Sequence, residues 1–221
     1  MSCTAFVTIG ESPRDDILYS MIPDWQGSAV IQHGALDSLD AMTLRKLGPG
    51  PQETPFVTRM ANGEEILVSK PSLMPFLQAA IDRAQADGAG SVVVLCTGAF
   101  PSLTADVPLI FPDRILQAAV DAVLPVGRIG VVMPHTDQSD LMRAKWETGM
   151  RSMIGAAASP YTSADKLAGI ASDLEKQCVD LIVLDCMGFT AEMKATVQQS
   201  VTVPVILANR LVGRIVEELA T

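Results

Sequence analysis

One short pattern occurs twice in this sequence and limits what the chain can fold into. It is an apolar, largely β-branched run that ends in a cysteine, with a glycine two residues later. The first copy is VVVLCTGAFP at 92–101 and the second is LIVLDCMGFT at 181–190. Such runs are typical of strands buried inside a parallel sheet. The repeat therefore predicts two equivalent strand ends, one carrying Cys96 and the other Cys186.

Strand-like runs alternate with helix-sized segments along the chain, which is the pattern of an α/β fold with helices on both faces of parallel sheets. The helical spacing of apolar residues at 71–87 ends at Gly88, a suitable C-cap. A second stripe at 163–178 places Cys178 in the core, and Asn209 is expected to cap the last helix. The predicted strands are 4–9, 29–33, 91–95, 128–133, 153–158, 181–184 and 203–207.

The two halves of the chain repeat one order of elements: strand, helix, strand, helix, strand, cysteine, helix. We therefore predict two pseudosymmetric parallel-sheet α/β units. The first half is longer by about 30 residues, and Asn62-Gly63 inside that surplus favours a type I′ hairpin within about 52–69. The predicted first unit is 1–110, completed by a strand and helix at 203–221 that return to it, and the second unit is 111–202.

Charge, hydropathy and cysteine content argue against several kinds of binding partner and against a metal site. The net charge is −9 and the pI is near 4.6, with no basic cluster, which argues against nucleic acid and anionic membranes. The apolar runs are shorter than the roughly 20 residues that span a bilayer. The start of the chain lacks the features of a signal peptide, so we expect a cytoplasmic protein. Four scattered cysteines favour free thiols, and the spacing of His33 and His135 suggests no metal; His33 is interpreted as structural.

The two cysteines are predicted to face one ligand. Ligands of open parallel sheets bind beyond the carboxyl ends of the strands, where helix starts stabilise anions and should lower a thiol pKa toward neutrality. Gly98 and Gly188 would let a substrate carboxylate approach the backbone. One thiolate could then remove an α-proton while the opposite thiol delivers one, with no cofactor required. Taken singly, each cysteine would be read as a small buried hydrophobe; the repeated context favours a functional pair.

The loop after the first strand supplies further candidates for substrate binding. Pro13 suits the first position of a helix, with Ser12 as its cap. Arg14 could bind a second carboxylate of the substrate or pair with a nearby acid such as Asp15 or Asp16. Both readings of Arg14 remain open on the sequence.

The other candidates follow later strands. In the second unit, Pro134, His135 and Thr136 occupy the loop that corresponds to 12–14. His135 could tune a thiol, bind substrate or make only local contacts at a helix start. The candidates of the two cysteine loops are Thr97, Gly98, Met187, Gly188 and Thr190, although Thr190 fits a helix N-cap equally well.

The segments TIGESPRDDI, ALDSL, LCTGAF and LDCMGFT closely resemble the AroM family, within the aspartate/glutamate/hydantoin racemase superfamily. The resemblance implies an active site between two pseudosymmetric α/β units, a small-molecule carboxylate substrate and a homodimer, since related folds often dimerise. The superfamily includes amino-acid and hydantoin racemases, maleate-type isomerases and malonate decarboxylases. Several of these use both cysteines, whereas the decarboxylases keep one.

Two departures from glutamate racemases argue against glutamate as the substrate. Those enzymes carry Asp-Ser-Gly after the first strand, where this chain has Gly-Glu-Ser-Pro-Arg at 10–14. They also carry Thr-His after the second cysteine, where this chain has Met187-Gly188. The second cysteine loop is nearer to the Cys-Ala-Gly of hydantoin racemases.

The leading hypothesis is a cofactor-independent racemase or epimerase that uses two cysteines at a carbon α to a carboxylate or similar group. The first alternative is a thiolate-dependent cis–trans isomerase or decarboxylase of a small diacid. The second is a non-catalytic protein that binds a small carboxylate. A Cys96–Cys186 disulfide switch is disfavoured, because it needs Cα atoms within about 7 Å whereas a ligand cleft holds them farther apart.

Overall fold

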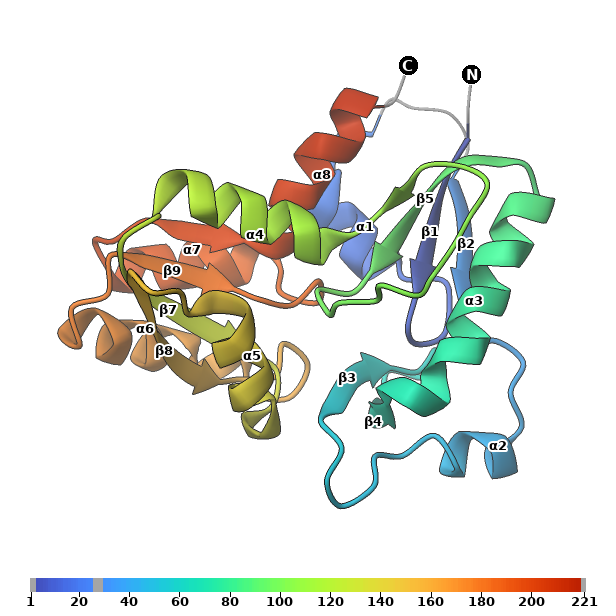
Figure 1. Ribbon diagram of the computed structural model, residues 1–221, viewed down its shortest axis with the longest axis horizontal. Helices are drawn as coiled ribbons and strands as arrows, with labels where there is room; N and C mark the ends of the chain where they lie inside the picture. The colour runs from blue at the N-terminus through green and yellow to red at the C-terminus, as the bar shows by residue number, and fades with distance from the viewer. Residues whose placement is uncertain (1–2, 26–29, 220–221) are drawn as a thin grey trace.

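The computed structural model describes residues 3–25 and 30–219, and its strands form two four-stranded parallel sheets (Figure 1). The first sheet has the order β2-β1-β5-β6 and the second β10-β9-β7-β8. The predicted α/β class is confirmed. The strands of the first sheet are β1 (Cys3–Thr8), β2 (Val30–Gly34), β5 (Ala89–Leu95) and β6 (Leu109–Ile110). Those of the second are β7 (Gly127–Met133), β8 (Arg151–Ala157), β9 (Leu181–Leu184) and β10 (Val205–Leu207).

Helices cover both sheets, as the alternating pattern predicts. They are α1 (Asp15–Met21), α2 (Ala41–Arg45), α3 (Lys70–Ala86), α4 (Pro112–Val123), α5 (Ser139–Trp146), α6 (Leu167–Lys176), α7 (Ala191–Ser200) and α8 (Ala208–Leu219). In α3, Gly88 follows the last turn with a φ of 89°, the left-handed conformation expected at that end. No helix within the described ranges is long and apolar enough to cross a membrane.

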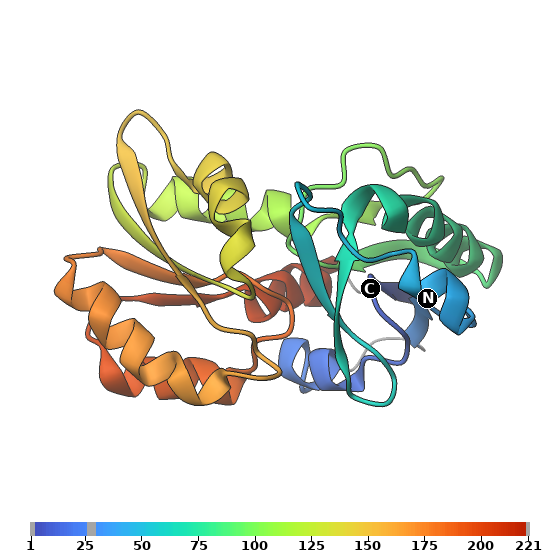
Figure 2. The same cartoon turned by 90° about the horizontal axis from the view of Figure 1, so that it is seen from below.

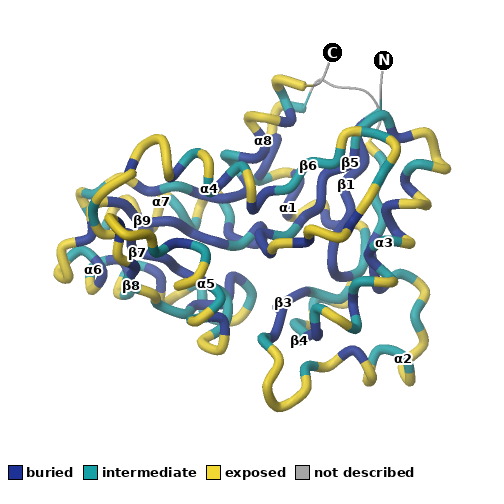
Figure 3. Tube along the Cα trace, in the orientation of Figure 1, coloured by how far each residue is buried: buried dark blue, intermediate teal, exposed yellow. Residues whose placement is uncertain are grey.

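A central hydrophobic core joins the two sheets. Alternate residues of a strand face opposite sides, so Val93 and Leu95 face this core whereas Val92 and Val94 face α3. From the second sheet, Ile129 and Val183 enter the same core. Helices α1, α4, α5 and α8 complete it, and Figure 3 shows β1, β5, β7 and β9 as mostly buried. The two units therefore share one packed interior, which fixes the carboxyl ends of β5 and β9 relative to each other.

The predicted hairpin is present as β3 (Pro55–Arg59) paired antiparallel with β4 (Glu65–Ser69). Its turn differs from the predicted type I′. The Gly63 N–H donates to the Met60 carbonyl at 2.9 Å, and Gly63 has a φ of 90° while Asn62 has no positive φ. The longer loop allows an ordinary turn followed by a left-handed glycine. In Figure 2 the two strands run through the middle of the view.

Three expectations about segments were wrong or incomplete. The strand in 203–221 does not return to the first sheet: β10 pairs with β9, while α8 packs on α1 and α4. Cys178 is exposed with a φ of 59°, because α6 ends at Lys176 and the chain leaves the apolar stripe. The two-residue strand β6 was missed because it is too short to show a period. Residue 29 of the predicted strand 29–33, and positions 1–2 and 220–221 of the predicted units, lie outside the described residues.

Gly213 allows α8 to pack closely on α1, and this contact generates a prediction. A Cβ at Gly213 would meet the Met21 carbonyl, a backbone group that cannot move aside. We expect Gly213→Ala to lower the free energy of unfolding by about 1–3 kcal/mol, measured by urea denaturation. Gly169→Ala is the matched control, since nothing lies within 4 Å of that helical position. It should be neutral or stabilise by up to about 1 kcal/mol; equal effects of the two variants would contradict close packing of α8.

Candidate active site

Both cysteines of the repeated pattern line one cavity between the two sheets. Cys96 follows the end of β5, and Cys186 lies two residues beyond the end of β9. Each sulfur accepts a hydrogen bond from the glycine two residues later, Gly98 N–H to Cys96 and Gly188 N–H to Cys186, both at 3.4 Å. The repeat in sequence is thus a repeat in local geometry. Only about 30 Å³ of the cavity is open to the centres of water molecules, enough for one or two waters.

The thiols are harder to ionise than the sequence suggested. Burial raises the pKa of Cys96 to about 12, and although the Gly98 N–H opposes this, the neighbouring Cys186 raises it further. Burial raises the pKa of Cys186 to about 11, against the lowering effects of the Gly188 N–H and Arg14. The expectation of a pKa near neutrality was wrong, because desolvation outweighs the backbone donors. Both thiols line the same cavity, and the pKa of each lies well above its ordinary value.

A buried lysine connects the two cysteine loops. Lys145, on α5, donates to the carbonyl of Thr97 at 3.0 Å and pairs with the carboxylate of Asp185 at 3.0 Å. Thr97 and Asp185 adjoin Cys96 and Cys186 respectively. The Asp185 side chain has no exposed surface; it also accepts from Trp146 Nε1 at 2.8 Å, and Asp113 contacts Lys145 at 3.2 Å. One ammonium group therefore fixes the relative position of loops that belong to different sheets.

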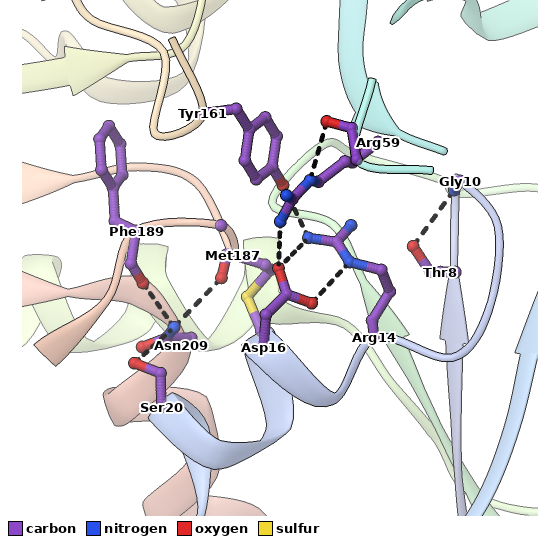
Figure 4. A network of polar contacts seen from close by, with 12 residues as sticks. Thr8, Gly10, Arg14, Asp16, Ser20, Arg59, Tyr161, Met187, Phe189 and Asn209 are labelled. Carbon is purple, nitrogen blue, oxygen red and sulfur yellow. Dashed lines mark hydrogen bonds and ion pairs between the residues drawn. The ribbon is translucent and has the colours of Figure 1, made fainter. Parts of the chain in front are cut away.

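Tyr161 and two arginines form a second polar network (Figure 4), and Tyr161 interacts electrostatically with Cys186. Arg14 is 4% exposed. Its guanidinium donates two hydrogen bonds to the Asp16 carboxylate, at 2.9 and 2.8 Å, and one to the Tyr161 hydroxyl at 3.0 Å. Arg59 contacts the Tyr161 ring, 5.6 Å from its centroid, and pairs with Asp16 at 3.5 Å. Burial raises the pKa of Tyr161, so the phenol stays protonated. Of the two readings of Arg14, the pairing with Asp16 is present, and the guanidinium also acts electrostatically on Cys186.

Each cysteine loop packs under an aromatic ring. A Cβ at Gly98 would meet the ring of Phe56, and a Cβ at Gly188 would meet the Tyr161 ring, with Cζ at 2.8 Å. On the sequence, a substrate carboxylate was expected to approach the backbone at these two glycines. In the structure, aromatic rings occupy that space. The two rings differ: Phe56 is apolar and lines the cavity, whereas Tyr161 carries a hydroxyl group, packs on Gly188 and lies outside the cavity lining.

The hairpin closes the cavity by contacts with the second unit. Its Pro55 carbonyl accepts from Gln138 Nε2 at 2.9 Å, and Glu65 accepts from the Ser159 hydroxyl. Phe56 and Val57 of the hairpin line the cavity directly. The segment inserted into the first unit thus forms part of the wall around both thiols.

The structure brings some of the predicted site residues to the cavity and places others outside its lining. Ser12 does not cap α1, which begins at Asp15; its hydroxyl donates to Asp37 at 2.8 Å, and the Ser12–Pro13 peptide bond is cis. His135 accepts from the Asp137 N–H at 3.2 Å, a local contact at a helical turn. The predicted residues that line the cavity are Cys96, Thr97, Gly98, Pro134, Cys186 and Met187.

Three more residues named in the sequence analysis lie at or near helix starts, and each makes a local or structural contact there. Thr190 caps α7 by accepting from the Met193 N–H at 3.3 Å. The Thr136 carbonyl accepts from the Ser139 hydroxyl at 2.7 Å. Asn209 does not cap the last helix, because α8 begins at Ala208; its amide donates instead to the carbonyls of Met187 and Phe189 (Figure 4). Asn209 thereby holds the second cysteine loop.

Sequence reasoning missed Lys145, Asp185, Tyr161 and Gln138. Asp185 had a usable signal, since a carboxylate that ends a wholly apolar run must find a buried partner. Lys145 and Tyr161 had none, because their partners are far away in the chain. Gln138 lies two residues after the candidate loop 134–136, and no role was assigned to it from the sequence.

Comparison with known proteins gives a family and a fold. The family model described as AroM protein matches residues 4–220. A liganded variant of arylmalonate decarboxylase has 15% identity and a TM-score of 0.66, with 100% of this chain and 92% of that chain covered. A glutamate racemase isoform from Bacillus anthracis has 13% identity and a TM-score of 0.64, covering 99% and 81%. No curated protein sequence matches the chain. At such identities the structural similarity establishes the fold.

The Lys145 cluster generates a prediction for stability. Lys145→Met leaves the carboxylate of Asp185 buried without its cation, so we expect the free energy of unfolding to fall by about 3–5 kcal/mol in urea denaturation. Arg143→Met on the same helix is the control: it removes the more exposed Arg143–Glu147 pair, worth about 0.3–0.5 kcal/mol. Adding Asp185→Asn to Lys145→Met should recover part of the loss. Equal losses for the Lys145 and Arg143 variants would show that the cluster is not what holds the loops.

Proposed function

This chain belongs to the AroM family, and we propose that it is a cofactor-independent racemase or epimerase in which Cys96 and Cys186 transfer protons at a carbon α to a carboxylate. The observation that carries the proposal is the shared cavity. Two thiols with matching backbone donors approach it from the ends of two different sheets. A planar intermediate between them would meet a sulfur on each face.

The proposed reaction conserves protons and electrons. The Cys186 thiolate takes the α-proton as the C–H bond breaks, and the electron pair moves into the carboxylate to give an enediolate. The Cys96 thiol then donates its proton to the opposite face, which inverts the carbon and leaves Cys96 as the thiolate. Which thiol starts as the base depends on the enantiomer that is bound: Arg14 favours the charged form of Cys186, and Lys145 favours that of Cys96. The reverse reaction starts from Cys96.

The neighbours in structure support a small carboxylate as the substrate. The solved structures that share this fold include enzymes named for glutamate and for arylmalonate. Two buried cations act electrostatically on the thiols, Lys145 on Cys96 and Arg14 on Cys186, and each favours the charged form of its thiol. The cavity has room for water only, so substrate entry requires the hairpin contacts at Pro55 and Glu65 to open.

A decarboxylase or cis–trans isomerase of a small diacid is the second candidate, and the unlike surroundings of the thiols favour it. Cys186 lies by Arg14 and Tyr161, whereas Cys96 lies by Lys145 and Phe56. One thiol could then act alone, either as nucleophile or as proton donor. A protein that only binds a carboxylate would need neither.

Isotope exchange distinguishes these functions. We expect the wild-type protein in D2O to exchange the α-proton of its substrate, detected by proton NMR on a pool of chiral amino, N-carbamoyl, hydroxy and dicarboxylic acids and hydantoins. Cys96→Ala and Cys186→Ala should each reduce inversion by at least about 100-fold, since each removes one of the two proton-transfer groups. Cys178→Ala is the control, because that thiol is exposed and away from the cavity.

The outcomes of the exchange experiment are distinct. Full activity in one of the two cavity variants would replace the proposal by the one-thiol candidate. Shifts caused by ligand without exchange, unchanged in both variants, would leave a binding protein.

The rate should depend on pH through the raised thiol pKa values. The reactive species is a thiolate, and the lower pKa is about 11, so the thiolate fraction grows tenfold for each unit of pH well below that value. We therefore expect kcat/KM for exchange to rise about tenfold per unit between pH 7 and pH 9. The Cys178→Ala variant should follow the same profile. A plateau already present at pH 7 would mean that neither buried thiol is the base that limits the rate.

A further inference from the structure

Gln138 lines the cavity but takes no part in the proposed proton transfer between the two thiols. It closes the short helical turn Thr136–Gln138, is 5% exposed, and lines the cavity together with both cysteines. Its side chain therefore contributes polar atoms to a wall that is otherwise largely apolar, with Phe56, Leu141 and Met142 as neighbours in the lining.

The orientation of the Gln138 amide follows from its partner. The carbonyl of Pro55 can only accept, and it lies 2.9 Å from Gln138 Nε2, so the NH2 group must face the hairpin. The oxygen Oε1 is left as the free end of the amide. It has no hydrogen-bond partner among residues 3–25 and 30–219. A buried acceptor without a donor is unfavourable, and its cost disappears when a ligand supplies the donor.

The hydroxyl group of Thr97 and the carboxylate of Asp185, which also line the cavity, do not meet this need. Thr97 Oγ1 already donates to the Asp185 carbonyl at 3.3 Å. Asp185 is the only acidic residue lining the cavity in the described part of the chain, and its carboxylate is bound to Lys145 and Trp146. The cavity thus offers an acceptor for a neutral donor but no uncommitted carboxylate for a cationic one.

We infer that Gln138 selects acids that carry a neutral hydrogen-bond donor on the α-carbon, a hydroxyl or an amide-type N–H, which donates to Oε1. This inference rests on the proposed function and narrows its substrate class to 2-hydroxy acids and N-acylated or N-carbamoylated 2-amino acids. A free amino acid brings an ammonium group, whose burial beside an amide oxygen alone is costly. Gln138 is in this sense a specificity-determining residue.

The test compares acids that differ only in the donor. The probes are mandelate with its O-methyl ether, and N-acetylphenylglycine with its N-methylated form. Wild-type protein should exchange and bind the member with the donor at least about tenfold better, since the methyl group leaves Oε1 unpaired. Gln138→Met removes the acceptor at similar volume, and we expect the preference to fall to about one.

A control separates specificity from closure of the hairpin, because Gln138→Met also removes the contact with Pro55. Ser159→Ala removes the other polar contact of the hairpin, to Glu65, without changing the cavity lining. It should alter the rate for both members of a pair alike and keep the tenfold preference. The ratio between paired acids is thus the readout, and a merely structural role of Gln138 would not change it.

The outcomes separate this inference from the proposed function. If no acid exchanges, but ligand-observed NMR shows the preference for the donor in the wild type and its loss in Gln138→Met, the inference stands and the proposed reaction fails. If exchange occurs with equal rates for donor and methylated acids, the reaction stands and the inference is wrong. The inference is also overturned if Gln138→Met retains the preference for the donor, or if none of the four acids binds.

Discussion

The arrangement of this protein depends on one buried cation. Lys145 binds the carbonyl beside one cysteine and the carboxylate beside the other, so a single ammonium group joins two loops that belong to separate sheets. Burying such a charge is costly unless its partners are complete. Here Asp113, Asp185 and the Thr97 carbonyl supply them, and Trp146 supplies a donor to Asp185. The common core packs the two sheets together, and this cluster joins the cysteine loops that follow the ends of β5 and β9.

The features that are local in the chain could be predicted from the sequence. The strands that precede Cys96 and Cys186, the helix that precedes Gly88 and the inserted hairpin all follow from short-range patterns of apolar residues and glycine. The neighbours of the thiols could not be predicted in this way. Lys145 reaches Asp185 across 40 residues of chain, and Arg14 reaches Tyr161 across 147. No periodicity encodes such pairs; only the packed core brings them together.

The thiol pKa values show the same limit in energetic terms. Loops at the ends of parallel strands do offer N–H groups to sulfur, as the sequence implied, and both glycine donors are present. The sequence does not reveal how completely Phe56, Tyr161 and the hairpin remove water from that place. Desolvation therefore prevails, and the same closure that makes the charge expensive also strengthens every remaining electrostatic interaction with it.

The unlike aromatic rings on the two cysteine loops have a thermodynamic consequence. Phe56 lies over one loop and Tyr161 over the other, so mirror-image ligands would meet loops held in unlike surroundings. Enantiomers have equal free energies in water, which forces kcat/KM to be the same in both directions of a racemisation. The kcat for one enantiomer can therefore exceed the kcat for the other only if its KM is larger by the same factor. The asymmetry of the rings would appear as unequal occupancy at saturation, and the ratio of enantiomers at equilibrium would stay at one.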